Sequence, residues 1–191
     1  MIPDSSSLLG QCLIAMPGLD DPRFERSVIY ICIHEADTGA MGLILNKPVT
    51  NVTFEELLKQ MDISHPEPLP PTPVLYGGPV DPNRGFVLHS LDYQTEETLP
   101  VSGTSLGLTT TLEILKERAD GRGPRHFLLA LGYAGWDPGQ LETEILANQW
   151  IHASLDDLDL LFQTRWPTKW QDCLKAAGIS LDTLSGEAGH A

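Results

Sequence analysis

The chain has 191 residues, of which 41% are hydrophobic, and a formal net charge of −14 from 12 basic and 26 acidic side chains. This length fits a single domain, and the apolar content excludes an intrinsically disordered chain. A field this negative repels the phosphate backbone, so direct DNA binding is not expected. Every apolar run is far shorter than the ~18 residues of a membrane span, so no membrane association is expected.

The cysteines and the first residues indicate the compartment. Cys12, Cys32 and Cys173 are odd in number and widely spaced, and two of them lie in apolar runs. This usage is typical of reduced, buried thiols. Residues 1–7 contain an acid and lack the basic stretch of a secretory signal. We therefore expect a cytoplasmic protein.

The first 90 residues are expected to form strands joined by turns, with one short helix. Thr53 and Glu56 have the spacing of a capping box, which predicts a helix over residues 53–60. The proline-rich segment 65–73 predicts a stiff surface connection. Apolar and β-branched runs bounded by turn residues predict strands, two of them paired as a hairpin. These strands cover residues 9–15, 27–34, 41–46, 74–76 and 85–90, and the hairpin joins 27–34 to 41–46.

The second half of the chain mixes helices with short strands. Amphipathic or glycine-terminated patterns predict helices over residues 109–118 and 168–177. Strands are predicted over residues 127–131 and 150–153. Because strands outnumber helices and several neighbours connect as hairpins, the pattern favours an α+β fold over a regular βαβ array.

A glycine-rich corner follows the strand 127–131. The strand is expected to end there, with Asp137 as the N-cap of a new helix and Pro138 at its first position. Gln140 would then close the capping box. Gln140 and Glu144 lie one helical turn apart, where they either line a pocket or form the solvated side of the helix.

Residues 103–107 match the G-x-S-x-G pattern of a hydrolase nucleophile, with Ser105 at its centre. That motif needs a buried strand before the serine, but residues 96–102 are polar and contain a proline. We therefore interpret the segment as a loop leading into a helix, and assign no nucleophile.

Three histidines, His34, His89 and His126, lie at or near predicted strand ends. They could converge on a proton-transfer site, although a single histidine at a strand end is more often a hydrogen-bonded structural residue. His34 begins a H-E-x-x-H pattern, but Thr38 occupies the position of the second histidine. No metal and no cofactor are expected.

Several strings of residues, taken in order, are specific to one family. They are L-I-A-M-P at 13–17, F-E-R-S-V-I-Y at 24–30, G-A-M-G-L-I-L-N-K-P at 39–48, Y-G-G-P-V at 76–80, R-G-F-V-L-H at 84–89, and G-Y-A-G-W at 132–136 with G-Q-L-E at 139–142 and Glu144. In these strings the chain resembles the YqgE/AlgH family of bacterial proteins, from about residue 8 to residue 178.

The resemblance implies a single α+β domain over residues 1–191, with a coiled, barrel-like, mainly antiparallel sheet surrounded by helices. An ordered core over residues 8–178 with flexible ends is expected. The biochemical activity of the family is not established. Some members are labelled transcriptional regulators, but this chain has no recognisable helix-turn-helix, so any such role is expected to be indirect.

Three functional hypotheses follow. The first is a cytoplasmic binding or regulatory protein that holds a small molecule or a protein partner, with no prediction of oligomeric state. The second is a small hydrolase or transferase that uses His89 or His34 as acid and base, and the third is a regulator of transcription acting through a protein partner. The pocket of the first hypothesis is predicted to gather the polar and glycine residues of the matching strings, namely Asn46, Gly77, Gly78, His89, Gly135, Trp136, Gln140 and Glu144.

Overall fold

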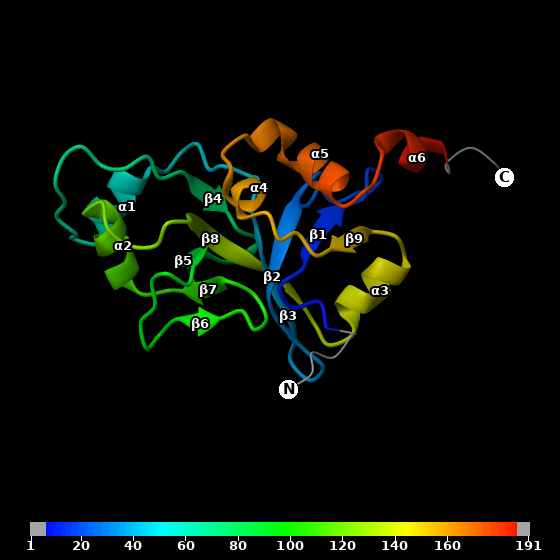
Figure 1. Cartoon of the computed structure of the whole chain (residues 1–191), viewed down its shortest axis with the longest axis horizontal. Helices are drawn as coiled ribbons and strands as arrows, with labels where there is room; N and C mark the ends of the chain where they lie inside the picture. Colours follow the sequence, from blue (N-terminus) through cyan, green and yellow to red (C-terminus); the bar gives the residue numbers. More distant parts are fainter. Residues whose placement is uncertain (1–6, 187–191) are drawn as a thin grey trace.

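The structure is a computed structural model that describes residues 7–186. Within this range the chain forms one curled β-sheet and six helices (Figure 1). The strands are β1 (Cys12–Ala15), β2 (Val28–Glu35), β3 (Gly39–Ile44), β4 (Val74–Tyr76), β5 (Val80–Ser90), β6 (Leu99–Pro100), β7 (Leu106–Thr109), β8 (Phe127–Trp136) and β9 (Trp150–Ala153). The helices are α1 (Phe54–Gln60), α2 (Leu112–Ala119), α3 (Gln140–Leu146), α4 (Leu158–Phe162), α5 (Trp166–Ala176) and α6 (Leu181–Gly186).

The sheet has the strand order β6-β7-β5-β8-β3-β2-β1-β9, and β4 pairs with β8 outside this path. All pairings are antiparallel except that between β4 and β8. The sheet curls into a half-barrel, and β8 lies at its middle with β3, β4 and β5 as partners (Figure 1). The expected α+β fold with a barrel-like, mainly antiparallel sheet is therefore confirmed.

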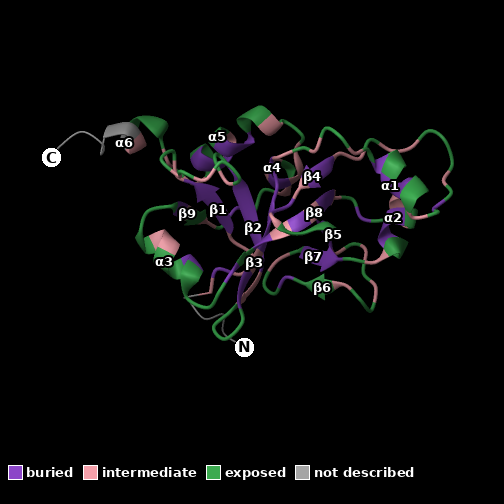
Figure 2. Ribbon diagram, turned by 180° about the vertical axis from the view of Figure 1, so that it is seen from behind, coloured by how far each residue is buried: buried purple, intermediate pink, exposed green. Residues whose placement is uncertain are grey.

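Three hydrophobic clusters hold the helices against the sheet, and the strand residues that form them are buried, whereas β6 and the first half of β5 are exposed (Figure 2). The first joins α4 and α5 to β1, β2 and β3, and the second joins α3 to the other side of these strands. The third joins α1 and α2 to β4 and β5. β8 supplies all three clusters, through Leu128, Trp136 and Leu129 respectively.

Local patterns located most of these elements. The hairpin of β2 and β3 is confirmed, as are β4 and β9 with the bounds predicted. At α1, the hydroxyl of Thr53 accepts from Glu56 N, and the carboxylate of Glu56 accepts from Thr53 N at 2.8 Å, so the predicted capping box is present. None of the described helices has the length and apolar character needed to span a bilayer.

The glycine-rich corner differs from its prediction. β8 continues to Trp136 instead of ending at Leu131, because Gly132 adopts a φ of 73° inside the strand and Gly135 pairs with Met41 of β3. The N-cap of α3 is Gly139 in the left-handed conformation, so Asp137 and Pro138 precede the helix.

The segment 103–107 also differs from its prediction. It joins β6 to β7, so a strand follows Ser105 where a helix was expected. The strands β6 and β7 were not predicted because they are short, and a proline and a glycine interrupt their apolar residues. Neither α4 nor α6 was predicted, and α6 extends the fold beyond residue 178. The expected flexibility at residues 1–6 and 187–191 concerns positions outside the described residues.

Candidate functional site

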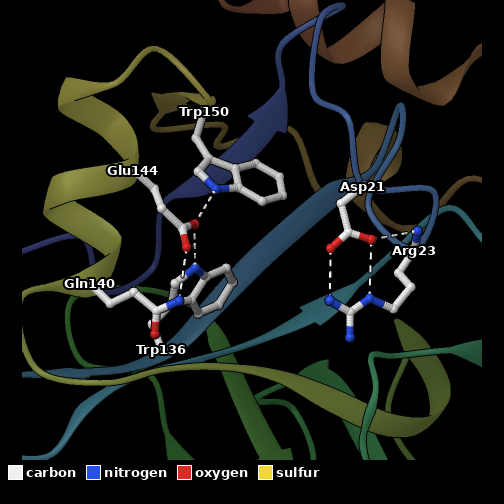
Figure 3. A network of polar contacts seen from close by, with 6 residues as sticks. All are labelled: Asp21, Arg23, Trp136, Gln140, Glu144 and Trp150. Carbon is white, nitrogen blue, oxygen red and sulfur yellow. Dashed lines mark hydrogen bonds and ion pairs between the residues drawn. The ribbon is translucent and has the colours of Figure 1, made fainter.

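The carboxylate of Glu144 is the centre of a polar network on α3 (Figure 3). Its Oε2 accepts from Trp136 Nε1 at 2.9 Å and from Trp150 Nε1 at 2.8 Å. Its Oε1 accepts from Gln140 Nε2 at 2.9 Å. The two indole rings meet edge to face, with centroids 6.2 Å apart. The acid therefore joins α3 to the ends of β8 and β9.

The hydrogen bonds of the network show what the predicted polar pair, Gln140 and Glu144, contacts in the structure. Gln140 also accepts from the backbone N–H of Asp137 at 3.0 Å, so its side chain spans the turn and the helix. Glu144 receives three donors, two of them from indoles that are only 6% and 4% exposed. Gln140 is exposed and Glu144 is half-buried, and the pair anchors the helix through these bonds.

A groove of about 500 Å³ lies beside this network, on the side of Gly135. The residues that line it include Ile33, Met41, Val80, Tyr133 and Trp136. A Cβ placed on Gly135 would meet only the Tyr133 ring at 3.3 Å and Val80 at 3.8 Å. The absence of a side chain at Gly135 therefore leaves space in the groove.

Gly77 and Gly78 serve a close approach between segments of backbone. A Cβ on Gly77 would lie 2.2 Å from Gly132 O, and one on Gly78 would lie 2.1 Å from the carbonyl carbon of Tyr133. The chain after β4 can therefore lie on β8 only if both positions lack a side chain. This contact explains both glycines without a ligand.

His89 lies away from the groove and is fully buried. Its Nδ1 is 3.0 Å from Ser90 O and its Nε2 is 2.8 Å from Thr109 Oγ1. Burial lowers the pKa of its imidazole, against a smaller opposing effect of the Ser90 carbonyl. His89 pairs with the first residue of β8, whereas Trp136 is the last, so the two positions are about 30 Å apart along the strand.

The other two histidines are engaged elsewhere. His34 Nδ1 accepts from Leu8 N at 3.0 Å, and His34 Nε2 lies 2.7 Å from Glu142 Oε1. His126 Nε2 lies 3.5 Å from Asp159 Oδ1. Across residues 7–186, no three His, Cys, Asp or Glu side chains are grouped so that they could hold a metal ion. The three histidines do not share a site.

Ser105 lines a hollow of about 620 Å³ between the β6–β7 turn and residues 154–156. Its backbone carbonyl accepts from Leu91 N at 2.9 Å. Within the described residues, its hydroxyl has no bond to a histidine, and the strand–turn–helix setting of a nucleophile elbow is missing.

The eight predicted pocket residues thus occupy four places. Gly135, Trp136, Gln140 and Glu144 lie together, and Gly77 with Gly78 packs on the outer part of β8. His89 lies elsewhere. Asn46 belongs to the segment after β3 that pairs with Tyr76 and Gly77, but its side chain bonds to the backbone of Arg26 and Val28. Contact with a ligand at any of them stays a prediction, but a single cavity does not join all eight.

The family model described as AlgH-like matches residues 12–182. The chain belongs to the AlgH-like family. A UPF0301 protein of Methylobacterium nodulans is 48% identical, over 99% of this chain and 92% of its own length. One of Jannaschia sp. is also 48% identical, over 100% of this chain and 99% of its own. The resemblance inferred from the sequence strings is therefore confirmed.

Solved structures agree with this membership. The solution structure of the AlgH protein from Pseudomonas aeruginosa is 35% identical, covers 98% of both chains and superposes with a TM-score of 0.75. A crystal structure of a protein from Corynebacterium diphtheriae is 21% identical, covers 92% of this chain and 90% of its own, and gives a TM-score of 0.71. The second match shows the fold alone.

In this AlgH-like protein, the structure adds a cavity that sequence reasoning missed. Asn46 accepts from Val28 N at 2.9 Å and donates to Arg26 O at 2.8 Å. These bonds hold residues 24–30 next to residues 39–48. A cavity of about 220 Å³ lies at this contact, and Lys47 and the start of α5 also line it. Both strings are among those that match the family, so the sequence pointed to these two segments. It could not predict the cavity, because the contact of the two segments with α5 arises only in the folded protein.

Proposed function

We propose that this AlgH-like protein is a cytoplasmic, non-catalytic binding protein that holds a small uncharged, planar molecule in the groove beside Gly135. The observation that carries this proposal is the composition of the groove. Its wall is largely aliphatic and aromatic, and Asp137 is its one carboxylate among the described residues. A volume of about 500 Å³ lies within the range of small-molecule sites.

The alternative, a hydrolase or transferase that uses His89 or His34, has less support. Both ring nitrogens of each histidine already have partners within the protein. His89 is fully buried, so its ring presents no surface to a substrate in this structure. Acid–base catalysis requires a group within hydrogen-bond reach of the substrate, which neither ring offers.

A cytoplasmic location and an indirect regulatory role complete the proposal. Cys12, Cys32 and Cys173 are all free and buried, as expected in a reducing compartment. The regulatory role is suggested by the label of some family members, and the net charge of −14 favours action through a partner over DNA contact. Retention on a DNA column at low salt, fading with added salt, would contradict the indirect role.

The experiment that tests the groove uses Nile red, an uncharged planar dye whose fluorescence rises in apolar surroundings. We expect saturable binding by the native protein and its loss in Gly135→Val, because valine fills the space beside Tyr133. Gly85→Val is the matched control. Gly85 is also a strand glycine, and a Cβ there meets only Leu129 at 3.7 Å.

Two results would overturn the groove proposal. One is the absence of saturable dye binding to the native protein at concentrations where it is monodisperse. The other is equal binding by Gly135→Val and by Gly85→Val, with both variants folded by circular dichroism. Native mass spectrometry of protein taken directly from cells then identifies the natural occupant, as a mass lost from Gly135→Val alone.

A further inference from the structure

The cavity of about 220 Å³ around Arg26 and Lys47, called here the Arg26–Lys47 cavity, is formed by three segments far apart in the sequence. They are the residues before β2, the residues after β3 and the start of α5. Helix α5 packs across β1 and β2 above the half-barrel (Figure 1). The cavity therefore lies where a helix end meets two strand ends.

The charges lining this cavity are unusual for so acidic a chain. Arg26 and Lys47 both contribute to it, and Glu25 is its one carboxylate among the described residues. Neither cation has a carboxylate oxygen within 4.0 Å in the part of the chain that the structure describes. The lining is thus net positive on a protein of net charge −14, which creates a local site for an anion.

The backbone of Arg26 is held by its surroundings, and its exposed guanidinium lies over an aromatic ring. Its φ of 50° lies in the left-handed region, and its carbonyl oxygen accepts from Asn46 Nδ2 at 2.8 Å. Its guanidinium carbon lies 5.5 Å from the centre of the Trp170 ring, and that indole donates to Ala15 O at 2.9 Å. A preorganised cation loses less conformational entropy when it binds an anion.

The segment also contains a residue with a positive φ and, next to it, a buried polar group without a partner among the described residues. Arg26 holds a backbone conformation that favours glycine. The next side chain, Ser27, is fully buried, and its hydroxyl has no hydrogen-bond partner among the described residues. Strained backbone and unsatisfied polar groups of this kind concentrate at binding sites.

Two further sources of positive potential lie under the cavity. Lys169 is fully buried, and its Nζ donates to Leu45 O at 3.1 Å and to Leu161 O at 2.5 Å, 5.1 Å from the Trp166 ring centre. Trp166 is also the first residue of the 11-residue α5, so the positive end of the helix dipole faces the cavity. Burial lowers the pKa of Lys47, and an anion at this place would stabilise its charged form.

We propose that the Arg26–Lys47 cavity binds a small phosphate-bearing molecule. A dianionic phosphate gains about twice the Coulomb energy of a carboxylate from the same cations, and an arginine matches its oxygens in a bidentate manner. Trp166, which is half-buried and lines the cavity, provides an aromatic side chain for an attached planar group. This site is separate from the groove at Gly135, so either proposal can fail without the other.

The test measures binding of two probes, inorganic phosphate and phenyl phosphate, by calorimetry and by the intrinsic fluorescence of the four tryptophans at constant ionic strength. We expect saturable one-site binding by the native protein, with phenyl phosphate the tighter probe. Lys47→Gln is expected to weaken affinity about tenfold or more, since it removes a charge-assisted hydrogen bond. Glu25→Gln is expected to tighten affinity, because it removes the nearby negative charge.

Two further variants keep the test decisive. Arg26→Gly removes the guanidinium while suiting the positive φ, so it is expected to fold and to lose about tenfold or more in affinity. Lys116→Gln changes the net charge equally at an exposed site on α2 and is expected to bind like the native protein. The absence of saturable binding of either probe overturns the proposal. Equal weakening by Lys116→Gln and Lys47→Gln also overturns it, because the effect would then be general charge screening.

Discussion

Trp136 donates its indole N–H to Glu144 at 2.9 Å, and this bond joins the last residue of β8 to α3. Trp150 donates to the same oxygen from β9 at 2.8 Å (Figure 3). One carboxylate oxygen therefore satisfies two buried indoles on two strands. Glu144, for which contact with a ligand stays a prediction, holds three elements together.

Replacing Glu144 with alanine is expected to lower the free energy of unfolding by about 3 kcal/mol, because two buried indole N–H groups lose their acceptor. Glu144→Gln keeps an oxygen and should cost about 1 kcal/mol. Urea unfolding followed by tryptophan fluorescence measures both changes. Glu97→Ala, at an exposed acid in the β5–β6 connection, is the control. A Glu144→Ala variant as stable as this control would contradict the anchoring role.

The glycines near β8 are expected to differ sharply in tolerance. Gly78→Ala should prevent stable folding or cost more than about 4 kcal/mol, because its Cβ would lie 2.1 Å from the carbonyl carbon of Tyr133. Gly135→Ala should cost less than about 1 kcal/mol, since its Cβ meets only a side chain at 3.3 Å. Thermal denaturation measures the loss of stability in both variants. Similar losses would mean that the segment after β4 can shift away from β8 to make room for a Cβ.

Lys169 is expected to make stability rise with pH under alkaline conditions. Burial lowers the pKa of its ammonium from 10.5 to about 8. Between these values the unfolded chain retains the proton that the folded protein has lost, so the free energy of unfolding increases with pH, by roughly 3 kcal/mol across the window. The difference in stability between native protein and Lys169→Met, measured across this window, isolates the effect. A difference that does not change with pH would contradict it.

His89 is expected to act in the opposite pH range. Burial lowers the pKa of its imidazole below the ordinary 6.5, so the unfolded chain takes up a proton before the folded protein does. Stability is therefore lost as pH falls below about 6.5. His89→Gln should lose less stability than the native protein between about pH 7.5 and about pH 5. Equal losses would show that His89 is accessible to protons in the folded state, which would reopen its role as an acid or base.

Local sequence patterns predicted the elements that depend only on residues close together in the chain. The capping box at Thr53 and the hairpin of β2 and β3 follow from residues close in the chain. Gly132 was misread because a glycine signals a turn and a close approach of backbones equally well. Its Cβ would lie 2.4 Å from Gly78 O, a contact between positions 54 residues apart that no local pattern contains.

The candidate site was less predictable for the same reason. The proximity of Gln140 to Glu144 follows from helical spacing and is present. The proposed meeting of His89 with Trp136 required knowing that His89 pairs with the first residue of β8, whereas Trp136 is its last residue. The Arg26–Lys47 cavity required the docking of α5, which brings Trp166 and Trp170 from the other end of the sequence.

The position of β8 has a consequence for how the molecule opens. This strand supplies side chains to all three hydrophobic clusters and backbone partners to both halves of the sheet. Neither half keeps its core once β8 detaches, so unfolding is a single cooperative event. The amide hydrogens of β8 should therefore exchange with solvent only when the whole domain unfolds, and they set the upper limit of protection in the molecule.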